Sequence, residues 1–387
     1  MKVPQYKTWG TDIDPEARAQ MDAAISLPIT VAGALMPDAH VGYGLPIGGV
    51  LATDNAVIPY GVGVDIACRM MMTIFEVPPT ILQTEQSLYR SAIEKNTRFG
   101  IGAEWKVPKD HQVMDEDWNV TEVTRELKDR AHRQLGTSGS GNHFVEFGEV
   151  TFKEETLEIP GGTYLALLSH SGSRNVGAQV ANHFTRIAKS HHPELQGAAR
   201  NLAWLDMKGD GKEYWAAMEL MGKYASANHH IIHSSIIDFL GHPVIRQIEN
   251  HHNFAWKEQY KGRDVVVHRK GATPAGAGTI GIIPGSMASP GYIVEGLGNL
   301  ESLRSTSHGA GRRMSRTAAN KNSTWRELRD YLHQQGVTLI SAGLDEVPWA
   351  YKDINSVMAA QQDLARTLAT FMPRLVKMAP SGERPED

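Results

Sequence analysis

The sequence predicts an α+β fold built as one large domain over residues 1–377, with mixed β-sheets, glycine-rich loops and flanking helices. Short apolar runs bounded by glycine or proline, which are typical of buried strands, fill three separate parts of the chain. Helical patterns occupy the parts between them, without the strict alternation of a βαβ fold. No internal repeat or linker-like segment divides the 387 residues, so we expect a single domain.

The elements follow in blocks along the chain. Strands are expected in 29–36, 45–52 and 56–75, and a polar insertion over about 78–134 carries predicted helices at 87–96 and 120–135. Strands return at 136–150 and 163–177, and a second helical insertion covers about 176–240. Residues 250–315 again alternate strand and loop. Two helices, 323–335 and 355–377, are expected to close the domain, and 378–387 to form a frayed tail.

Composition narrows the class of protein. The 39 Lys and Arg residues against 43 Asp and Glu residues give a net charge of −4, which argues against a protein that coats nucleic acid non-specifically. No run approaches the ~18 apolar residues of a membrane helix, and the N-terminus lacks the apolar core of a signal peptide. Cys68 is the only cysteine, so no disulfide can form within the chain. We therefore expect a cytoplasmic protein without membrane contact.

The first candidate metal segment holds that cysteine. Asp65 precedes Cys68 by three residues at the end of a glycine-rich strand. A carboxylate and a thiolate at this spacing can face one metal ion. The competing interpretation is a small buried apolar residue, which is what most free cysteines are.

A second segment, 139–146, places small residues before an Asn-His pair. If it continues as a strand, His143 and Val145 share one face, while Asn142, Phe144 and Glu146 share the other. Its glycine spacing lacks the GK[ST] of a P-loop and the following helix of a Rossmann unit, so neither nucleotide-binding motif applies.

Other histidines require separate interpretations. His170 ends an apolar strand and enters a Ser-Gly-Ser-Arg turn, which is either an anion cradle or an ordinary capped turn. His251 and His252 are adjacent, so only one of them is expected to be a ligand. His229 and His233 have the spacing of a zinc pair on a helix, but the glutamate of a metalloprotease is missing between them. We expect these two side chains to lie on the helix surface or to pack against neighbouring elements rather than to bind a metal.

Two basic loops are the remaining candidate site segments. Residues 267–272 read VHRKGA, where two cations beside glycine suit phosphate. Residues 307–316 read SHGAGRRMSR, in which His308 precedes three arginines, a pattern expected of a nucleophile or base that handles a polyanion. A solvated basic turn explains the arginines but not the glycines. One carboxylate, one thiolate and several histidines beside basic loops are what a two-metal phosphoryl-transfer site needs.

Together these motifs resemble the RtcB family of RNA ligases. They appear in family order from about residue 36 to 377, and as a set they are highly specific. The matching segments are MPDAHVGYGLPIGG (36–49), GVGVDIAC (61–68), GNH (141–143), HSGSR (170–174), HN (252–253), HRKG (268–271), HGAGR (308–312), DE (345–346) and AYKD (350–353).

The resemblance implies an RNA ligase that depends on GTP and manganese. Such an enzyme joins a 3′-phosphate or 2′,3′-cyclic phosphate end to a 5′-hydroxyl end, in tRNA splicing or RNA repair. RNA with these ends is the implied partner, and an archease-like activator is a second partner that the resemblance raises. Manganese comes from the resemblance alone, because thiolate and imidazole ligands favour zinc by affinity.

The resemblance also assigns roles. Asp65, Cys68 and His143 would hold one metal ion, and Cys68, His170 and His252 the second. His308 would attack the α-phosphate of GTP and carry GMP. Nucleotide contacts are expected from Asn142, His143, Phe144, Val145, Glu146, His252, Asn253, Pro284, Gly285, Ser286, Met287, His308, Gly309, Ala310, Gly311, Tyr351 and Lys377. RNA phosphate contacts are expected from His268, Arg269, Lys270, Arg304, Arg312, Arg313 and Arg316.

A few positions depart from the family pattern. Ala67 and Arg69 flank the metal cysteine where glycine is usual, Gly291 stands where a serine is common, and His229 stands where an arginine is expected. None of these removes a ligand or the nucleophile, so we expect an active enzyme.

Two alternatives stay open. A dinuclear metal phosphodiesterase could hydrolyse cyclic phosphate ends with the same ligands, but it would not need His308 or the guanine contacts. A non-catalytic protein that binds RNA ends would be expected to lack a ligand, and none is missing.

Overall fold

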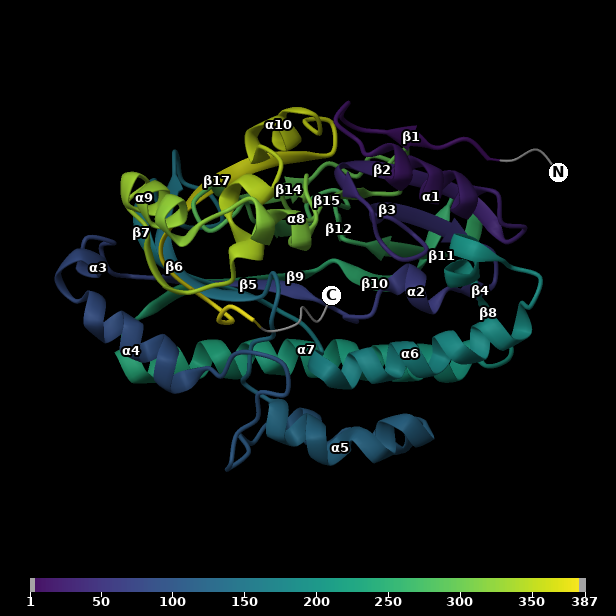
Figure 1. Cartoon of the computed structure of the whole chain (residues 1–387), viewed down its shortest axis with the longest axis horizontal. Helices are drawn as coiled ribbons and strands as arrows, with labels where there is room; N and C mark the ends of the chain where they lie inside the picture. The colour runs from purple at the N-terminus through teal and green to yellow at the C-terminus, as the bar shows by residue number, and fades with distance from the viewer. Residues whose placement is uncertain (1–3, 383–387) are drawn as a thin grey trace.

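The computed structural model describes residues 4–382 and confirms the α+β class. Two main β-sheets adjoin each other, the long helices α6 (Arg174–His191) and α7 (Gly211–Leu240) run beneath both, and α5 (Glu122–Gln134) lies outermost (Figure 1). Among the described residues, no helix is long and apolar enough to cross a membrane.

The smaller sheet has the strand order β1-β2-β3-β11-β10. Only β1 and β2 pair in parallel, and the other neighbours are antiparallel. Its strands are β1 (Lys7–Thr8), β2 (Thr30–His40), β3 (Ile47–Thr53), β10 (Asn253–Tyr260) and β11 (Arg263–Lys270). Helix α1 (Pro15–Ile25) packs Met21, Ala24 and Ile25 against one face of this sheet.

The larger sheet has the strand order β13-β14-β17-β6-β7-β5-β9, and β16 also pairs with β17. Its strands are β5 (Arg69–Phe75), β6 (Phe144–Phe152), β7 (Gly162–Ser171), β9 (Val244–His251), β13 (Ile280–Ile283), β14 (Gly291–Gly296), β16 (Thr338–Ser341) and β17 (Ala365–Met378). Two small ladders pair β4 (Ala56–Val57) with β8 (Leu205–Asp206) and β12 (Ala272–Pro274) with β15 (Ser305–Ser307). Strand β9 leads almost directly into β10, so one continuous segment links the two sheets.

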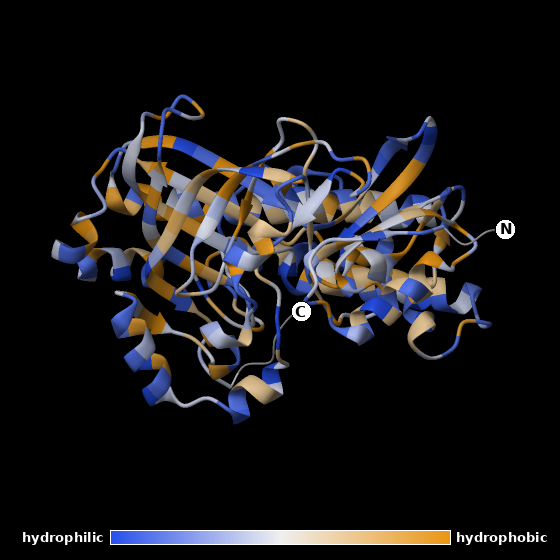
Figure 2. Ribbon diagram, turned by 90° about the horizontal axis from the view of Figure 1, so that it is seen from above, coloured by the Kyte–Doolittle hydropathy of each residue, from blue (hydrophilic) through white to orange (hydrophobic). Residues whose placement is uncertain are grey.

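The helical insertions form as expected. The remaining α-helices are α2 (Pro59–Val62), α3 (Ile81–Thr84), α4 (Gln86–Asn96), α8 (Arg316–Lys321), α9 (Trp325–Gln334) and α10 (Ile354–Ala359). Short 3-10 turns are η1 (Gln112–Asp115), η2 (Trp118–Val120), η3 (Gly197–Leu202), η4 (Leu344–Glu346) and η5 (Pro348–Ala350). Apolar residues lie mainly within the strands and on the inner sides of the helices, while polar residues lie on outer turns and loops (Figure 2).

The prediction of a closing helix over 355–377 is wrong. The helix ends at Ala359, and 365–378 is the long strand β17 between β14 and β6. The apolar residues in this segment fit both the helical and the strand period, and Pro373 was the signal against a helix interior; in β17 it lies at a shift of register between Pro373 and Leu375. The expected tail, 378–387, begins inside β17, since Met378 ends the strand and Ala379 is buried. Residues 383–387 of that tail lie outside the described residues.

Helix α7 is tied to β7 by a buried chain of hydrogen bonds. The Ser171 carbonyl can only accept, so His229 Nε2 donates to it (3.1 Å) and His229 Nδ1 accepts from Ser169 Oγ (2.7 Å). Ser169 Oγ then accepts from His233 Nε2 (2.8 Å), and His233 Nδ1 accepts from Thr73 Oγ1 (2.7 Å). This chain of hydrogen bonds fixes both imidazoles as neutral tautomers. The two histidines pack α7 against β7, as expected.

Buried histidines predict a marked loss of stability in acid. Burial lowers the pKa of His233 to about 3, of His251 to about 3 and of His268 to about 4. Below pH 6.5 the unfolded chain takes up these protons while the folded chain does not, so the free energy of unfolding falls as pH falls towards 4. At about 1.4 kcal/mol per pH unit for each group, the three together give a slope of about 4 kcal/mol per unit.

Urea unfolding of the metal-free protein, followed from pH 8 to pH 4.5, measures this slope. The free energy of unfolding should already fall between pH 8 and 7, because burial lowers the pKa of Lys270 to about 7, and it should decline steeply below pH 6.5. His333→Gln, at an exposed position on α9, should leave the slope unchanged. A stability maximum near pH 5 would contradict the prediction.

Candidate active site

Strands β6, β7, β5 and β9 are neighbours in the larger sheet, and their aligned ends bring polar side chains together at one side of it, called here the site edge. The antiparallel register places Arg69 of β5 opposite both Ser171 of β7 and His251 of β9, so these strand ends are aligned. In the same way Phe144 of β6 lies opposite His170. The side chains collected at this edge come from Cys68 (just before β5), His143 (just before β6), His170 (in β7) and His252 (just after β9).

The Cys68 thiol lies at the centre of this cluster. Its Sγ is 3.0 Å from His170 Nε2 and 3.5 Å from His143 Nε2. His143 Nε2 lies 3.0 Å from Asp65 Oδ2, and His170 Nε2 lies 3.2 Å from His252 Nε2. All five side chains are buried. They form two possible metal-binding groups, Asp65–Cys68–His143 and Cys68–His170–His252, which share the thiol.

The chemistry of these atoms fits a metal ion. His170 Nδ1 lies 3.0 Å from the Asn142 carbonyl, which only accepts, so His170 Nε2 presents a lone pair to the thiol and to His252. Burial lowers the pKa of His170 to about 3 and the pKa of His252 well below its ordinary value, so both imidazoles are neutral. His252 Nδ1 is buried without a hydrogen-bond partner. A single proton can bridge only one of the close contacts around His170 Nε2. A metal cation can accept electron pairs from the Cys68 sulfur and from both imidazole nitrogens at once.

The Ser-Gly-Ser-Arg turn does cradle an anion, and the anion is Asp65. Ser173 N donates to Asp65 Oδ1 (3.1 Å), and Ser173 Oγ donates to the Ile66 carbonyl (2.6 Å). A Cβ on Gly172 would lie 2.0 Å from Asp65 Oδ1, so only glycine fits there. Burial opposes ionisation of Asp65, but the hydrogen bond and charge of His143 outweigh it and lower the pKa of Asp65. The turn therefore holds a charged ligand in place.

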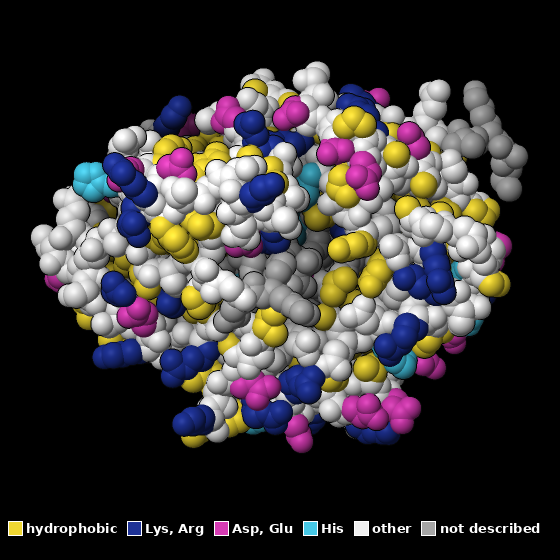
Figure 3. Space-filling model, in the orientation of Figure 1, with side chains coloured by type: hydrophobic (Ala, Val, Ile, Leu, Met, Phe, Trp, Pro, Cys, Tyr) yellow, Lys and Arg dark blue, Asp and Glu magenta, His cyan; other side chains and the backbone are white. Residues whose placement is uncertain are grey.

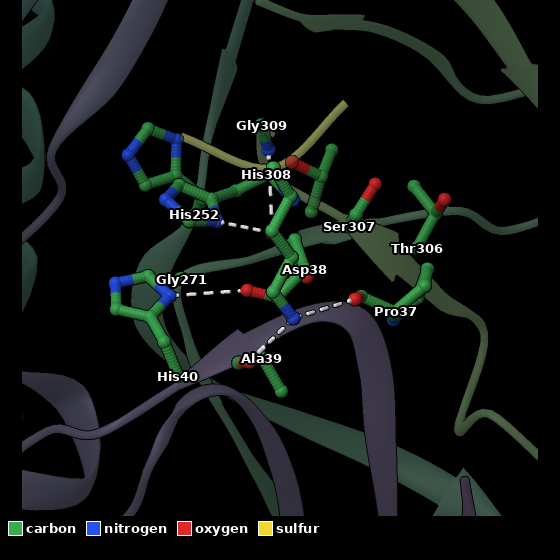
Figure 4. Close-up of polar contacts among 12 residues, drawn as sticks. Pro37, Asp38, Ala39, His40, His252, Gly271, Thr306, Ser307, His308 and Gly309 are labelled. Atoms are coloured by element: carbon green, nitrogen blue, oxygen red, sulfur yellow. Dashed lines mark hydrogen bonds and ion pairs between the residues drawn. The ribbon is translucent and has the colours of Figure 1, made fainter. Parts of the chain in front are cut away.

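His308 follows β15 and lies against Asp38 of β2 (Figure 4). His308 Nδ1 is 2.6 Å from Asp38 Oδ2, which also accepts from the backbone N–H groups of His308 (3.0 Å) and Gly309 (3.4 Å). Because the carboxylate accepts, Nδ1 carries the proton and Nε2 keeps its lone pair. Gly311, at φ +73°, allows this approach, since a Cβ there would lie 2.0 Å from the Asp38 carbonyl oxygen. The ring centres of His308 and His252 are 5.0 Å apart.

The sequence analysis gave no role to Asp38, although it lies in a matching motif. A carboxylate two residues after the apolar run 29–36, in a largely apolar surrounding, was the available signal, since a buried charge needs a partner. Glu346 was also missed. It is buried, its carboxylate accepts from the Tyr351 hydroxyl, and it lies within ion-pair distance of Arg312 and Arg316.

A pocket extends from His308 along the larger sheet and receives most of the expected nucleotide contacts. Its lining includes Asn142, Phe144, Glu146, Pro284, Gly285, Ser286, Met287, Gly309, Ala310, Gly311 and Tyr351, together with His308. The Asn142 side-chain oxygen is buried there without a partner, and burial raises the pKa of Glu146 well above its ordinary value. Phe144 and Glu146 face the pocket, as strand alternation predicts. Val145, which was also expected to contact the nucleotide, packs instead into a core cluster on the opposite side of β6 and does not line the pocket.

Four other expected nucleotide contacts lie elsewhere or are engaged. His143 and His252 belong to the metal-binding groups rather than to the pocket lining. Asn253 accepts from Gly271 N (2.7 Å) and donates to the Asp65 carbonyl (3.2 Å), so it joins the sheets. Lys377 lies on the other face of β17 from the pocket-lining Val376 and Met378, and it donates to Ser341 Oγ (3.2 Å).

The expected basic loop 267–272 is mostly strand β11, within the smaller sheet. His268 accepts from Ile58 N (2.9 Å), and Arg269 pairs with Glu258 (2.6 Å). Both side chains are fully enclosed, and Lys270 is buried with its ammonium donating to the Tyr43 carbonyl. In this structure His268 and Arg269 therefore do not reach an RNA phosphate.

The other four arginines that were expected to contact RNA phosphates lie in two different environments. Arg312 and Arg316 are held beside the pocket by ion pairs with Glu346, and Arg316 also pairs with Asp345 (2.9 Å). Arg313 is exposed, and Arg304 is half-buried at 4.0 Å from Glu258.

Comparison with known proteins shows the family of the chain. A family model described as "tRNA-splicing ligase RtcB" matches residues 20–378. The chain belongs to the RtcB family. It is 33% identical to the RNA-splicing ligase RtcB of Escherichia coli K12, over 94% of this chain and 95% of that protein. It is 31% identical to the tRNA-splicing ligase RtcB of Thermococcus kodakarensis (88% and 86% covered) and 30% identical to the RNA-splicing ligase RtcB of Mycobacterium tuberculosis (87% and 94% covered).

Two departures from the RtcB pattern now have a structural account. Ala67 has φ +57°, a left-handed conformation that glycine adopts without strain, and Ala67 N donates to the Asn253 carbonyl (2.7 Å). Arg69 points to helix α7, where it donates to the Gly222 carbonyl (3.1 Å), and it pairs with Glu249 of the neighbouring strand β9 (3.0 Å). Arg69 is thus engaged away from the metal-binding atoms.

Proposed function

We propose that this RtcB-family protein is a GTP-dependent RNA ligase that joins a 3′-phosphate or 2′,3′-cyclic phosphate end to a 5′-hydroxyl end. The observation that carries the proposal is the placement of His308, whose Nε2 lone pair is set by Asp38 beside the histidine–thiolate cluster and at the end of the pocket. The E. coli and T. kodakarensis relatives are named RNA- and tRNA-splicing ligases.

The proposed reaction has three group transfers. His308 Nε2 attacks the α-phosphorus of GTP, so that an N–P bond forms and the bond to the pyrophosphate oxygen breaks. An oxygen of the RNA 3′-phosphate then attacks the same phosphorus, the N–P bond breaks, and GMP is joined to the RNA end through a pyrophosphate linkage. Finally the 5′-hydroxyl loses its proton and attacks the RNA 3′-phosphorus, and GMP leaves. A cyclic phosphate is first opened by water.

The residues of the two metal-binding groups would hold two manganese ions. Bound there, the ions would neutralise phosphate charge and stabilise the pyrophosphate as it leaves. Asp38 keeps the proton on His308 Nδ1, so the nucleophile needs no prior deprotonation. The guanine base is assigned to the pocket, whose lining includes Glu146 and Tyr351 and where the unpartnered Asn142 oxygen can accept a hydrogen bond.

The test is ligation itself. Purified protein, GTP and Mn²⁺ are incubated with one RNA carrying a 3′-phosphate and another carrying a 5′-hydroxyl, and joined product is measured on a denaturing gel. Joining that requires GTP supports the proposal. Opening of a cyclic phosphate without joining, and without dependence on GTP, would favour the metal phosphodiesterase instead.

Asp38 provides a sharper prediction for the first step. In Asp38→Asn the amide can donate to Nδ1, which leaves the proton on Nε2 and removes the attacking lone pair. We expect GMP transfer to slow by at least about 100-fold, with GTP affinity nearly unchanged. Single-turnover guanylylation over a range of GTP concentrations separates the two effects. A change confined to GTP affinity would contradict the positioning role.

A further inference from the structure

The loop between β2 and β3, residues 41–46, forms one lip of the pocket. His40 before it and Ile47 after it both line the pocket. The loop backbone is firmly held, because Gln20 bonds both backbone groups of Gly42 (2.5 and 3.0 Å) and Lys270 Nζ donates to the Tyr43 carbonyl (2.5 Å). Yet the Tyr43 side chain is 66% exposed. An aromatic ring on a fixed backbone beside a pocket has the form of a stacking platform for a base.

The surface continues from this lip onto helices α2 and α6. A Cβ on Gly44 would lie 2.7 Å from the Asn201 carbonyl oxygen, so the loop packs directly on η3, which in turn packs against both helices. Tyr60 of α2 donates to Asn182 Oδ1 of α6 (3.0 Å), and Lys189 Nζ of α6 lies 5.1 Å from the centre of the Tyr60 ring. A second aromatic ring and a cation therefore follow Tyr43 along the surface.

This surface carries positive charge that the protein does not neutralise. Arg200, next to Asn201, is exposed, and within residues 4–382 neither Lys189 nor Arg200 forms an ion pair with an acidic side chain. Burial, followed by the charge of Arg200, lowers the pKa of Lys189, which agrees with two cations lying close together. Over the face shown in Figure 3, basic and acidic side chains are mostly interspersed.

We propose that Tyr43, Tyr60, Lys189 and Arg200 form a binding surface for single-stranded RNA beside the ends to be joined. The two rings stack on bases, and the two cations contact phosphates without reading sequence. The inference rests on the proposed function, because it extends the same site to the strand that enters it. It also gives RNA a surface in place of the enclosed His268 and Arg269.

Binding of short single-stranded RNA, followed by fluorescence anisotropy, tests the stacking platform. One oligonucleotide carries a 3′-phosphate and a second carries a 5′-hydroxyl, so the two arms show which strand uses the lip. Tyr43→Ala should weaken binding of at least one of them by about tenfold, while Tyr43→Phe, which keeps the ring, should bind like the wild type.

Salt dependence tests the cations. For the double variant Lys189→Gln, Arg200→Gln, the slope of log affinity against log salt should be shallower by about 1.4, or about 0.7 for each lost phosphate contact. Lys153→Gln removes the same kind of charge from an exposed position just after β6 and should leave the slope unchanged.

GMP transfer without RNA separates the two proposals. If the wild type gains GMP and both the Tyr43→Ala and the double variant bind both oligonucleotides like the wild type, this inference is overturned and the ligase proposal stands. If the wild type gains no GMP and binds neither oligonucleotide, the ligase proposal itself fails.

Discussion

His308→Ala should remain folded and never gain GMP, whereas the wild type should gain one GMP after incubation with GTP and Mn²⁺. Without the imidazole there is no Nε2 lone pair at the end of the pocket, and no N–P bond can form. Intact-protein mass spectrometry measures the adduct directly. His333→Ala, which removes an exposed histidine on α9, is the matched control and should gain GMP normally.

The same variant separates the steps of the reaction. His308 acts only until GMP has passed to the RNA, so His308→Ala should still join RNA whose 3′-phosphate already carries GMP. Failure to join this activated RNA would show that His308 also takes part in the last transfer. A GMP adduct on His308→Ala at the wild-type yield would refute its assignment as the nucleophile.

Cys68→Ala should lose ligation almost completely, because one thiolate serves both metal-binding groups. Removing it leaves two ligands in each group, and the loss of bound cations should slow ligation by at least about 1,000-fold. Elemental analysis of dialysed protein should show that the wild type retains manganese and that the variant does not. Ligation like the wild type's at equal metal concentration would exclude the bridging role.

The neighbouring histidines supply the control. His251 packs on Trp256 with ring centres 5.1 Å apart and belongs to neither metal-binding group. His251→Phe keeps an aromatic ring in that position and should retain manganese, while His252→Phe should lose part of it. Equal loss from both variants would show that packing, rather than ligation, governs metal content.

Residue type and spacing were enough to suggest a metal or phosphate site, since Asp65, Cys68 and the loop histidines combine unusual chemistry with glycine-rich surroundings, but the set of metal ligands came from the family resemblance. What brings them together is the register of β9, β5, β7 and β6, which depends on pairings between distant parts of the chain. The family resemblance supplied that grouping. Strand alternation placed Val145 on the face opposite Phe144 and Glu146, yet Val145 was still expected to contact the nucleotide, and the structure buries it in the core.

The local sequence could not show which polar residues the fold buries. The run His268-Arg269-Lys270 has the composition of a basic loop, but its partners Ile58, Glu258 and Tyr43 lie far away or on another strand. The segment 355–377 failed for a related reason, because its apolar spacing fits a helix until the neighbouring strands β14 and β6 are known. Asp38 gained its role only when the fold brought His308 to it.

The chain of hydrogen bonds between α7 and β7 makes the effects of substitutions interdependent. Each hydroxyl gives its proton to one imidazole and accepts from the next, and Gln247 Nε2 donates to Thr73 Oγ1 (3.0 Å) at the far end. A change at Thr73 therefore alters which tautomer suits His229, although the two side chains share no direct hydrogen bond. Double-mutant cycles across this chain of hydrogen bonds should be non-additive. Whether a substitution at one position is tolerated should depend on which residues occupy the other positions. An arginine at position 229, which the family resemblance leads one to expect there, cannot accept a hydrogen bond from Ser169, so His229→Arg should destabilise the protein unless Ser169 or His233 also changes.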